Sequence, residues 1–167
     1  MATPTNLPTA FVAGDILTAA NMNLIRGGFR ILQVVQGVTS TAVTNSTTTV
    51  ADTGLTATIT PQFNTSKILV MVNQAGCEKT PANSQNAINL YLVRGATTIQ
   101  QFVYVGLYTN TALENVGNFS TVFLDSPATT AATTYKTQFA NFNASALVAV
   151  QLSSIPQSTI TLLEISA

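Results

Sequence analysis

The chain has 167 residues, of which 63 are Thr, Ser, Asn or Gln and only 7% are charged, with a formal net charge of zero. Soluble domains usually carry about 25% charged residues, so this chain lacks the basic surface that binds nucleic acid, and we expect no nucleic-acid partner. The absence of histidine excludes Ser-His-Asp and Cys-His nucleophiles and histidine-bound zinc.

A chain of this length suits one domain, or one domain and an arm. Apolar residues make up 46% of it, but no apolar run approaches the roughly 18 residues of a membrane span. Residues 1–10 have neither the basic nor the continuous apolar region of a signal peptide. The single cysteine, Cys77, cannot form an intramolecular disulfide. We therefore expect a soluble protein with no membrane partner, consistent with assembly in a reducing cytosol.

Residues 1–28 are predicted to be an arm with one short helix. Pro4 and Pro8 favour an extended start. Thr18 is a suitable N-cap and Gly27 a suitable C-terminal residue for a helix over residues 19–26. Two helical turns are marginal alone in water, so this helix needs a surface on which to lie.

From Ile31 onward, β-branched and aromatic residues dominate, with turn residues every 8 to 15 positions. This pattern predicts an all-β, antiparallel sandwich. The run Ile68–Val72 is apolar throughout, which predicts a central strand covered on both faces. Arg94-Gly95-Ala96 predicts a hairpin turn between two pairing strands. The expected strands cover residues 31–39, 47–52, 55–60, 67–74, 87–93, 97–105, 119–125, 134–142, 147–152 and 159–165.

Asp52-Thr53-Gly54 matches the short signature of aspartic proteases, in which two such aspartates share a proton. No second copy of the motif occurs, so catalysis would require a dimer that meets at this loop. The alternative, which we favour, is a tight turn between two strands. The six carboxylates are scattered singly along the sequence, although a pair formed only in the fold stays possible. We predict no catalytic residues, no metal site and no cofactor.

The aromatic run over residues 102–108 places Phe102, Tyr104 and Tyr108 on one face of an extended strand. Such a stripe could stack on a sugar, but it is more often part of a core, which we favour. The low charge and the mean hydropathy of +0.34 indicate that part of the apolar surface is buried between subunits. We therefore expect an oligomer.

Several segments resemble small virion proteins of tailed bacteriophages. Phe11-Val-Ala-Gly-Asp-Ile-Leu-Thr-Ala-Ala-Asn-Met-Asn23 is similar to their N-terminal segment. Their companion β domain resembles the segments 51–61, 66–72, 92–95, 123–129, 134–139 and 159–165. In this family, the β domain occurs on capsid decoration (cement) proteins and at the ends of tail or head fibres.

The resemblance implies a jelly-roll-like sandwich over residues 29–167, preceded by a docking arm over residues 1–28. The implied function is capsid decoration: the protein, a homotrimer, binds the major capsid protein on the virion surface after assembly in the bacterial cytoplasm. The alternative is a fibre or receptor-binding protein, and only this alternative implies a glycan ligand. A fibre needs a shaft between arm and tip, which this spacing lacks. The predicted docking residues are Phe11, Ile16, Leu17, Met22, Leu24 and Ile25.

Overall fold

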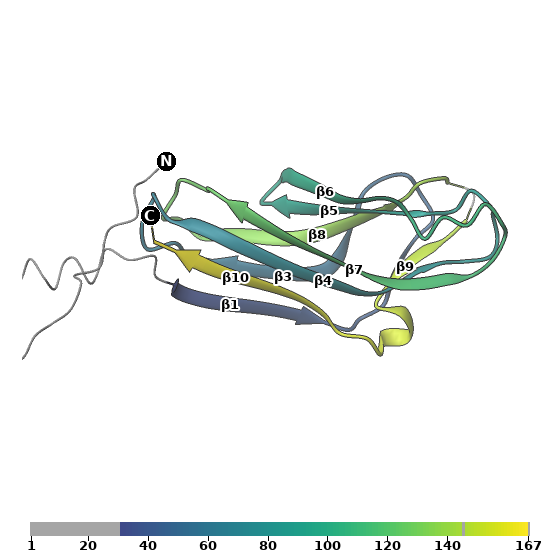
Figure 1. Ribbon diagram of the computed structural model, residues 1–167, viewed down its shortest axis with the longest axis horizontal. Coiled ribbons are helices and arrows are strands. Elements are labelled where there is room, and N and C mark those ends of the chain that lie inside the picture. Colours follow the sequence, from purple (N-terminus) through teal and green to yellow (C-terminus); the bar gives the residue numbers. More distant parts are fainter. Residues whose placement is uncertain (1–30, 145, 167) are drawn as a thin grey trace, which may run out of the picture.

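The computed structural model describes residues 31–144 and 146–166. Their strands form two antiparallel sheets packed face to face (Figure 1), so the predicted all-β sandwich is confirmed. The predicted arm and its helix lie outside the described residues. The elements are β1 Ile31–Thr39, β2 Val43–Asn45, β3 Ala51–Ile59, β4 Lys67–Lys79, β5 Ile88–Arg94, β6 Thr97–Gly106, β7 Asn115–Asp125, β8 Thr133–Asn141, β9 Val148–Val150, the 3-10 turn η1 Leu152–Ser154, and β10 Ser158–Ile165.

Sheet A contains β1, β10, β4 and β7, with the short strands β9 and β2 continuing it beside the far end of β4, and sheet B has the order β3-β8-β5-β6. If the eight long strands are numbered in chain order, the sheets run 1-8-3-6 and 2-7-4-5. This is the strand arrangement of a jelly roll, in which two Greek keys form a double sheet. The strand order therefore confirms the predicted jelly roll.

The core consists of two apolar clusters separated by a buried polar network. One cluster surrounds Ile68, Val70 and Leu162, and the other surrounds Cys77 and Phe139. The network between them contains hydrogen-bonded side chains from both sheets, in which Thr137 donates to Gln74 at 2.8 Å and Gln74 donates to Ser158 at 3.1 Å. Because buried polar groups need partners, this network aligns the two sheets.

The segment around Gly54 differs from the prediction. Two strands and a tight turn were expected there, but β3 runs through as one strand with a bulge between Asp52 and Thr56. Gly54 has a φ of 83°, a conformation that glycine adopts without steric cost. The glycine therefore bends the strand instead of ending it.

The strand β4 is central in sheet A, as predicted, because it pairs with β10 on one side and β7 on the other. Its inward residues Ile68, Val70 and Val72 are buried. The prediction that both faces are covered is wrong for this chain alone, because Met71 on the outer face is 44% exposed. The predicted β5–β6 hairpin is confirmed, with Arg94 opposite Thr97 and Gly95 at a φ of 58°.

Candidate functional site

The predicted docking residues all precede Ile31 and lie outside the described part of the chain. They stay a prediction. The described residues offer four candidate features: the Asp-Thr-Gly segment, a polar cluster at one end of the sandwich, an exposed aromatic pair on sheet B, and the outer face of sheet A.

The Asp52 carboxylate forms an ion pair with Lys136 Nζ at 2.8 Å and accepts a hydrogen bond from Gln138 at 2.6 Å. Burial acts to raise the pKa of Asp52, but the hydrogen bonds from Lys136 and Gln138 outweigh it and lower the pKa below its usual value. Thr53 is buried and bonds to Thr137 on β8. A carboxylate held ionised by a lysine is not prepared to share a proton with a second aspartate, so this geometry does not support the protease interpretation.

A second cluster joins β5, β7 and β8. Arg94 Nη1 donates to both carboxylate oxygens of Asp125, at 2.7 and 2.8 Å. The hydroxyl of the buried Tyr135 donates to Asp125 Oδ2 at 2.6 Å. Burial, followed by the Asp125 carboxylate, raises the pKa of Tyr135 well above its ordinary value. Tyr135 therefore stays protonated and acts as a hydrogen-bond donor that fixes Asp125 in place.

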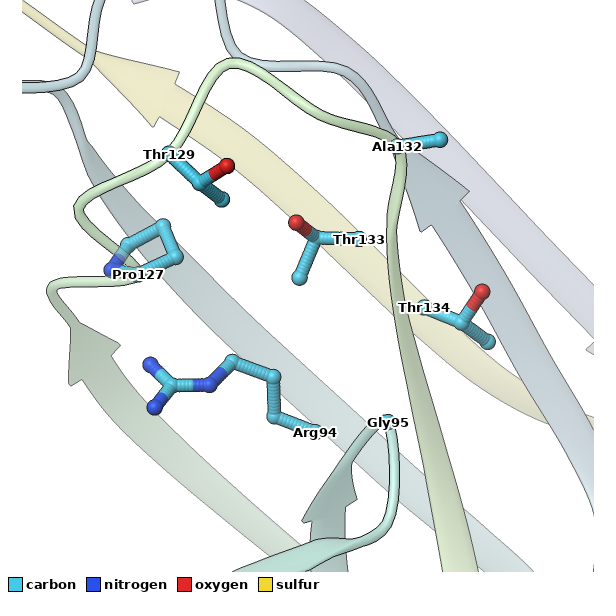
Figure 2. Close-up of a pocket in the computed structure, with 7 residues that line it drawn as sticks. All are labelled: Arg94, Gly95, Pro127, Thr129, Ala132, Thr133 and Thr134. Atoms are coloured by element: carbon cyan, nitrogen blue, oxygen red, sulfur yellow. The ribbon is translucent and has the colours of Figure 1, made fainter.

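This cluster borders a shallow hollow of about 300 Å³ (Figure 2). In Figure 2 the Arg94 side chain lies below Pro127, and Thr129 and Thr133 lie on the opposite side of the hollow. The Arg94 charge is already neutralised by Asp125, and the other lining side chains are hydroxyl or aliphatic. The hollow therefore presents no nucleophile with a base, and the cluster ties three strands together. Its lining residues are Arg94, Gly95, Pro127, Thr129, Ala132, Thr133 and Thr134.

The aromatic run on β6 does not form a single stripe. A bulge at residue 102 lets Phe102 pack against both core clusters, whereas Tyr104 faces outward and is 70% exposed. The core interpretation is therefore correct for Phe102 and wrong for Tyr104. Tyr104 contacts Phe142 edge to face, with ring centroids 5.9 Å apart. Phe142 follows β8, and sequence spacing gave no sign of this pairing.

The described part of the chain contains no group of three or more Cys, Asp or Glu side chains that could hold a metal ion. Burial raises the pKa of Glu78, and the charge of the nearby Glu114 raises it further. Within the same residues, no helix has the length and apolar character needed to cross a membrane.

The outer face of sheet A, formed by the outward-facing residues of β1, β10, β4 and β7, is the most apolar open surface among the described strands. The strand register aligns these residues into rows across the four strands. The sequence contained a signal for this face: both Ile68–Val72 and Val122–Leu124 are continuous apolar runs, and the register sets them side by side. The large apolar residues more than two-fifths exposed here are Ile31, Val34, Val38, Met71, Val116, Val122 and Leu124.

No known family model matches the sequence, and comparison with curated proteins finds no match. Among solved structures, the chain is similar to the crystal structure of the infectious bursal disease virus VP2 subviral particle, with a TM-score of 0.41 and 12% sequence identity. The match covers 80% of this chain and 39% of the VP2 chain, so this chain spans well under half the length of that protein. A likeness this distant transfers no function.

Proposed function

We propose that this protein is a capsid decoration protein of a tailed bacteriophage, which binds the major capsid protein on the virion surface and stabilises the head. The resemblance of Phe11–Asn23 and of the β segments to small phage virion proteins supports this role. The observation that favours this role over a fibre role is the short spacing between the arm motif and the sandwich. The sandwich strand β1 begins at Ile31, so fewer than ten residues separate the arm motif from the sandwich, which leaves no length for a shaft.

The proposed role is mechanical. The arm residues lie on the major capsid protein, while the sandwich associates with its copies as a homotrimer. Binding only the assembled shell stabilises that shell by mass action. No residue is proposed as catalytic, and no cofactor takes part. The docking residues are Phe11, Ile16, Leu17, Met22, Leu24 and Ile25.

The test is co-sedimentation of the full chain with expanded empty capsids that lack this protein. Replacing Leu17 and Leu24 together by Asp should abolish co-sedimentation, because charged residues cannot be buried against the shell without a large desolvation cost. Replacing Thr5 and Thr9 by Asp adds the same charge to polar positions and should leave binding intact. Unchanged binding of the Leu17 and Leu24 variant would refute docking through the arm.

One observation favours a second candidate, a fibre or receptor-binding protein. The exposed Tyr104–Phe142 pair on sheet B offers aromatic surface of the kind that stacks on sugars. This role predicts that the protein binds host cells and blocks infection, and that Tyr104→Ala removes both effects. Decoration predicts that the protein binds capsids and ignores cells. Cell binding without capsid binding would reverse the order of the two proposals.

A further inference from the structure

The strand β4 carries more apolar sequence than this chain buries. An apolar run such as Ile68–Val72 is typical of a strand covered on both faces. In the structure, its inward residues are at most 3% exposed, whereas Met71 on the outer face is 44% exposed. The outward residues of the run, Leu69 and Met71, are therefore only partly buried, and a second surface would complete their burial.

The apolar character extends beyond β4 over the middle of the outer face of sheet A, because the register aligns outward residues of four strands. Figure 1 shows β1, β10, β4 and β7 side by side. One row across them reads Val34, Leu163, Leu69, Leu124, and the next reads Gln36, Thr161, Met71, Val122. None of these eight residues is charged. These two rows thus form one continuous neutral surface, and the charged outward residues of β4, Lys67 and Glu78, lie beyond it near the two ends of that strand.

The area of this surface approaches what a stable interface needs. Its seven large apolar residues with open areas are each 44 to 60% exposed. Together they present on the order of 600 Å² of mainly apolar surface, against about 800 Å² per partner in a standard interface. The partly exposed Leu69, Leu163 and Ile165 between them add to this area. A patch of this size is at the upper limit for a free monomer.

The composition of the outer face of sheet A indicates what kind of partner can cover it. A partner rich in Lys or Glu would have to desolvate those charges against apolar side chains, which is costly. A neutral apolar face is complemented by a surface of the same kind, and the cores of homodimer interfaces have this composition. The middle of the outer side of sheet B is more polar, because the Asp52–Lys136 ion pair and exposed Thr56 and Thr58 lie there. A second copy of this chain therefore supplies the matching surface.

We propose that copies of this chain associate through the outer face of sheet A, which turns toward the symmetry axis of a closed assembly. This inference rests on the self-association included in the proposed function, but not on binding to a capsid. It also explains why the apolar run of β4 exceeds the needs of one sandwich.

The first test is the mass of the full-length protein, measured by light scattering. The wild type should have a small multiple of the 17.5 kDa chain mass. Val122→Glu, which places a charge at the β7 end of one row beside Met71, should have the mass of one chain and retain the β-type circular dichroism spectrum. The control Ile155→Glu changes an apolar residue that is 82% exposed and lies outside the face, and it should keep the wild-type mass. A monomeric wild type, or a Val122→Glu oligomer of wild-type mass, would overturn the proposal.

A milder variant covers the case in which Val122→Glu does not fold. The one native cysteine, Cys77, is buried, and burial raises the pKa of its thiol to about 12, so it should not react with maleimide. In freshly reduced protein, Val122→Cys should react at least tenfold more slowly than Ile155→Cys, and dilution to the monomer should remove most of the difference. Equal rates at high concentration would contradict the proposal.

These results separate the inference from the decoration role. An oligomer that Val122→Glu dissociates, but that ignores capsids, would support the interface and refute decoration. A monomer that still co-sediments with capsids would refute the interface and leave decoration standing.

Discussion

Gly37 on β1 lies against the backbone of β3 in the opposite sheet, and a larger residue does not fit there. A Cβ atom at this position would overlap the carbonyl oxygen of Thr56 and lie 2.8 Å from its carbon, and the side chain of Ile160 would be 3.1 Å away. Thr56 is held in the ladder between β3 and β8, so its backbone cannot turn aside. Gly37→Ala therefore forces the edges of the two sheets apart.

Overpacking of this kind costs about 1 to 3 kcal/mol, and contact with backbone on one side places this site near the upper end. Alanine also reduces the conformational entropy of the unfolded chain, which offsets about 0.4 to 1 kcal/mol of this cost. We therefore expect Gly37→Ala to lower the free energy of unfolding by about 2 kcal/mol. The corresponding fall in Tm is about 4 to 8 °C for a chain of this size.

The assay is urea unfolding followed by circular dichroism, with all proteins at one concentration because self-association affects stability. Gly95→Ala is the matched control: no atom lies within 4 Å of its added Cβ, but its φ is 58°, so about 1 kcal/mol of backbone strain is expected. A Gly37→Ala variant within 0.5 kcal/mol of the wild type would refute the steric argument.

Three further predictions concern the polar contacts. Burial acts to raise the pKa of Glu164, but hydrogen bonds from Gln33 (2.6 Å) and the backbone of Gln62 (2.7 Å) outweigh it and lower the pKa. The stability that ionised Glu164 contributes is therefore present above its unfolded pKa and lost as the pH falls through the folded pKa. In denaturant titrations, Glu164→Gln should lose less free energy of unfolding than the wild type when the pH is lowered. Tyr135→Phe should lower the free energy of unfolding by about 1.5 to 3 kcal/mol, because a buried hydrogen bond to a carboxylate is lost, and wild-type stability in urea titration would contradict this. We expect no pepstatin-sensitive cleavage by the wild type and therefore no change in Asp52→Asn, and a cleavage activity that Asp52→Asn abolishes would contradict this.

The sequence was sufficient to predict the fold class and most strands, because β-branched residues and turn residues alternate clearly along the chain. The bounds of β1 agree with the expected residues 31–39, and the β5–β6 hairpin follows from Gly95. The continuity of β3 was missed because a glycine such as Gly54 is equally typical of a tight turn and of a bulge. The outward position of Tyr104 was missed because the sequence does not show the bulge at residue 102, and a bulge changes the face on which the later residues of its strand lie.

The polar cluster of Arg94, Asp125 and Tyr135 could not be predicted from local patterns. Its members belong to three strands, and the Arg94–Asp125 contact spans 31 positions. The apolar outer face was visible only in part. The run Ile68–Val72 indicated double coverage, but only the register shows that Val34, Leu163, Leu69 and Leu124 share one row. Long-range pairing carries that information, and periodicity within one strand does not.

The most direct test of the decoration role is the position of the protein on intact virions, measured by labelling with gold-conjugated antibody in electron microscopy. A decoration protein should give label distributed over the surface of the head. Label confined to tail or head fibres, or no label on virions whose protein content includes this chain, would contradict this role.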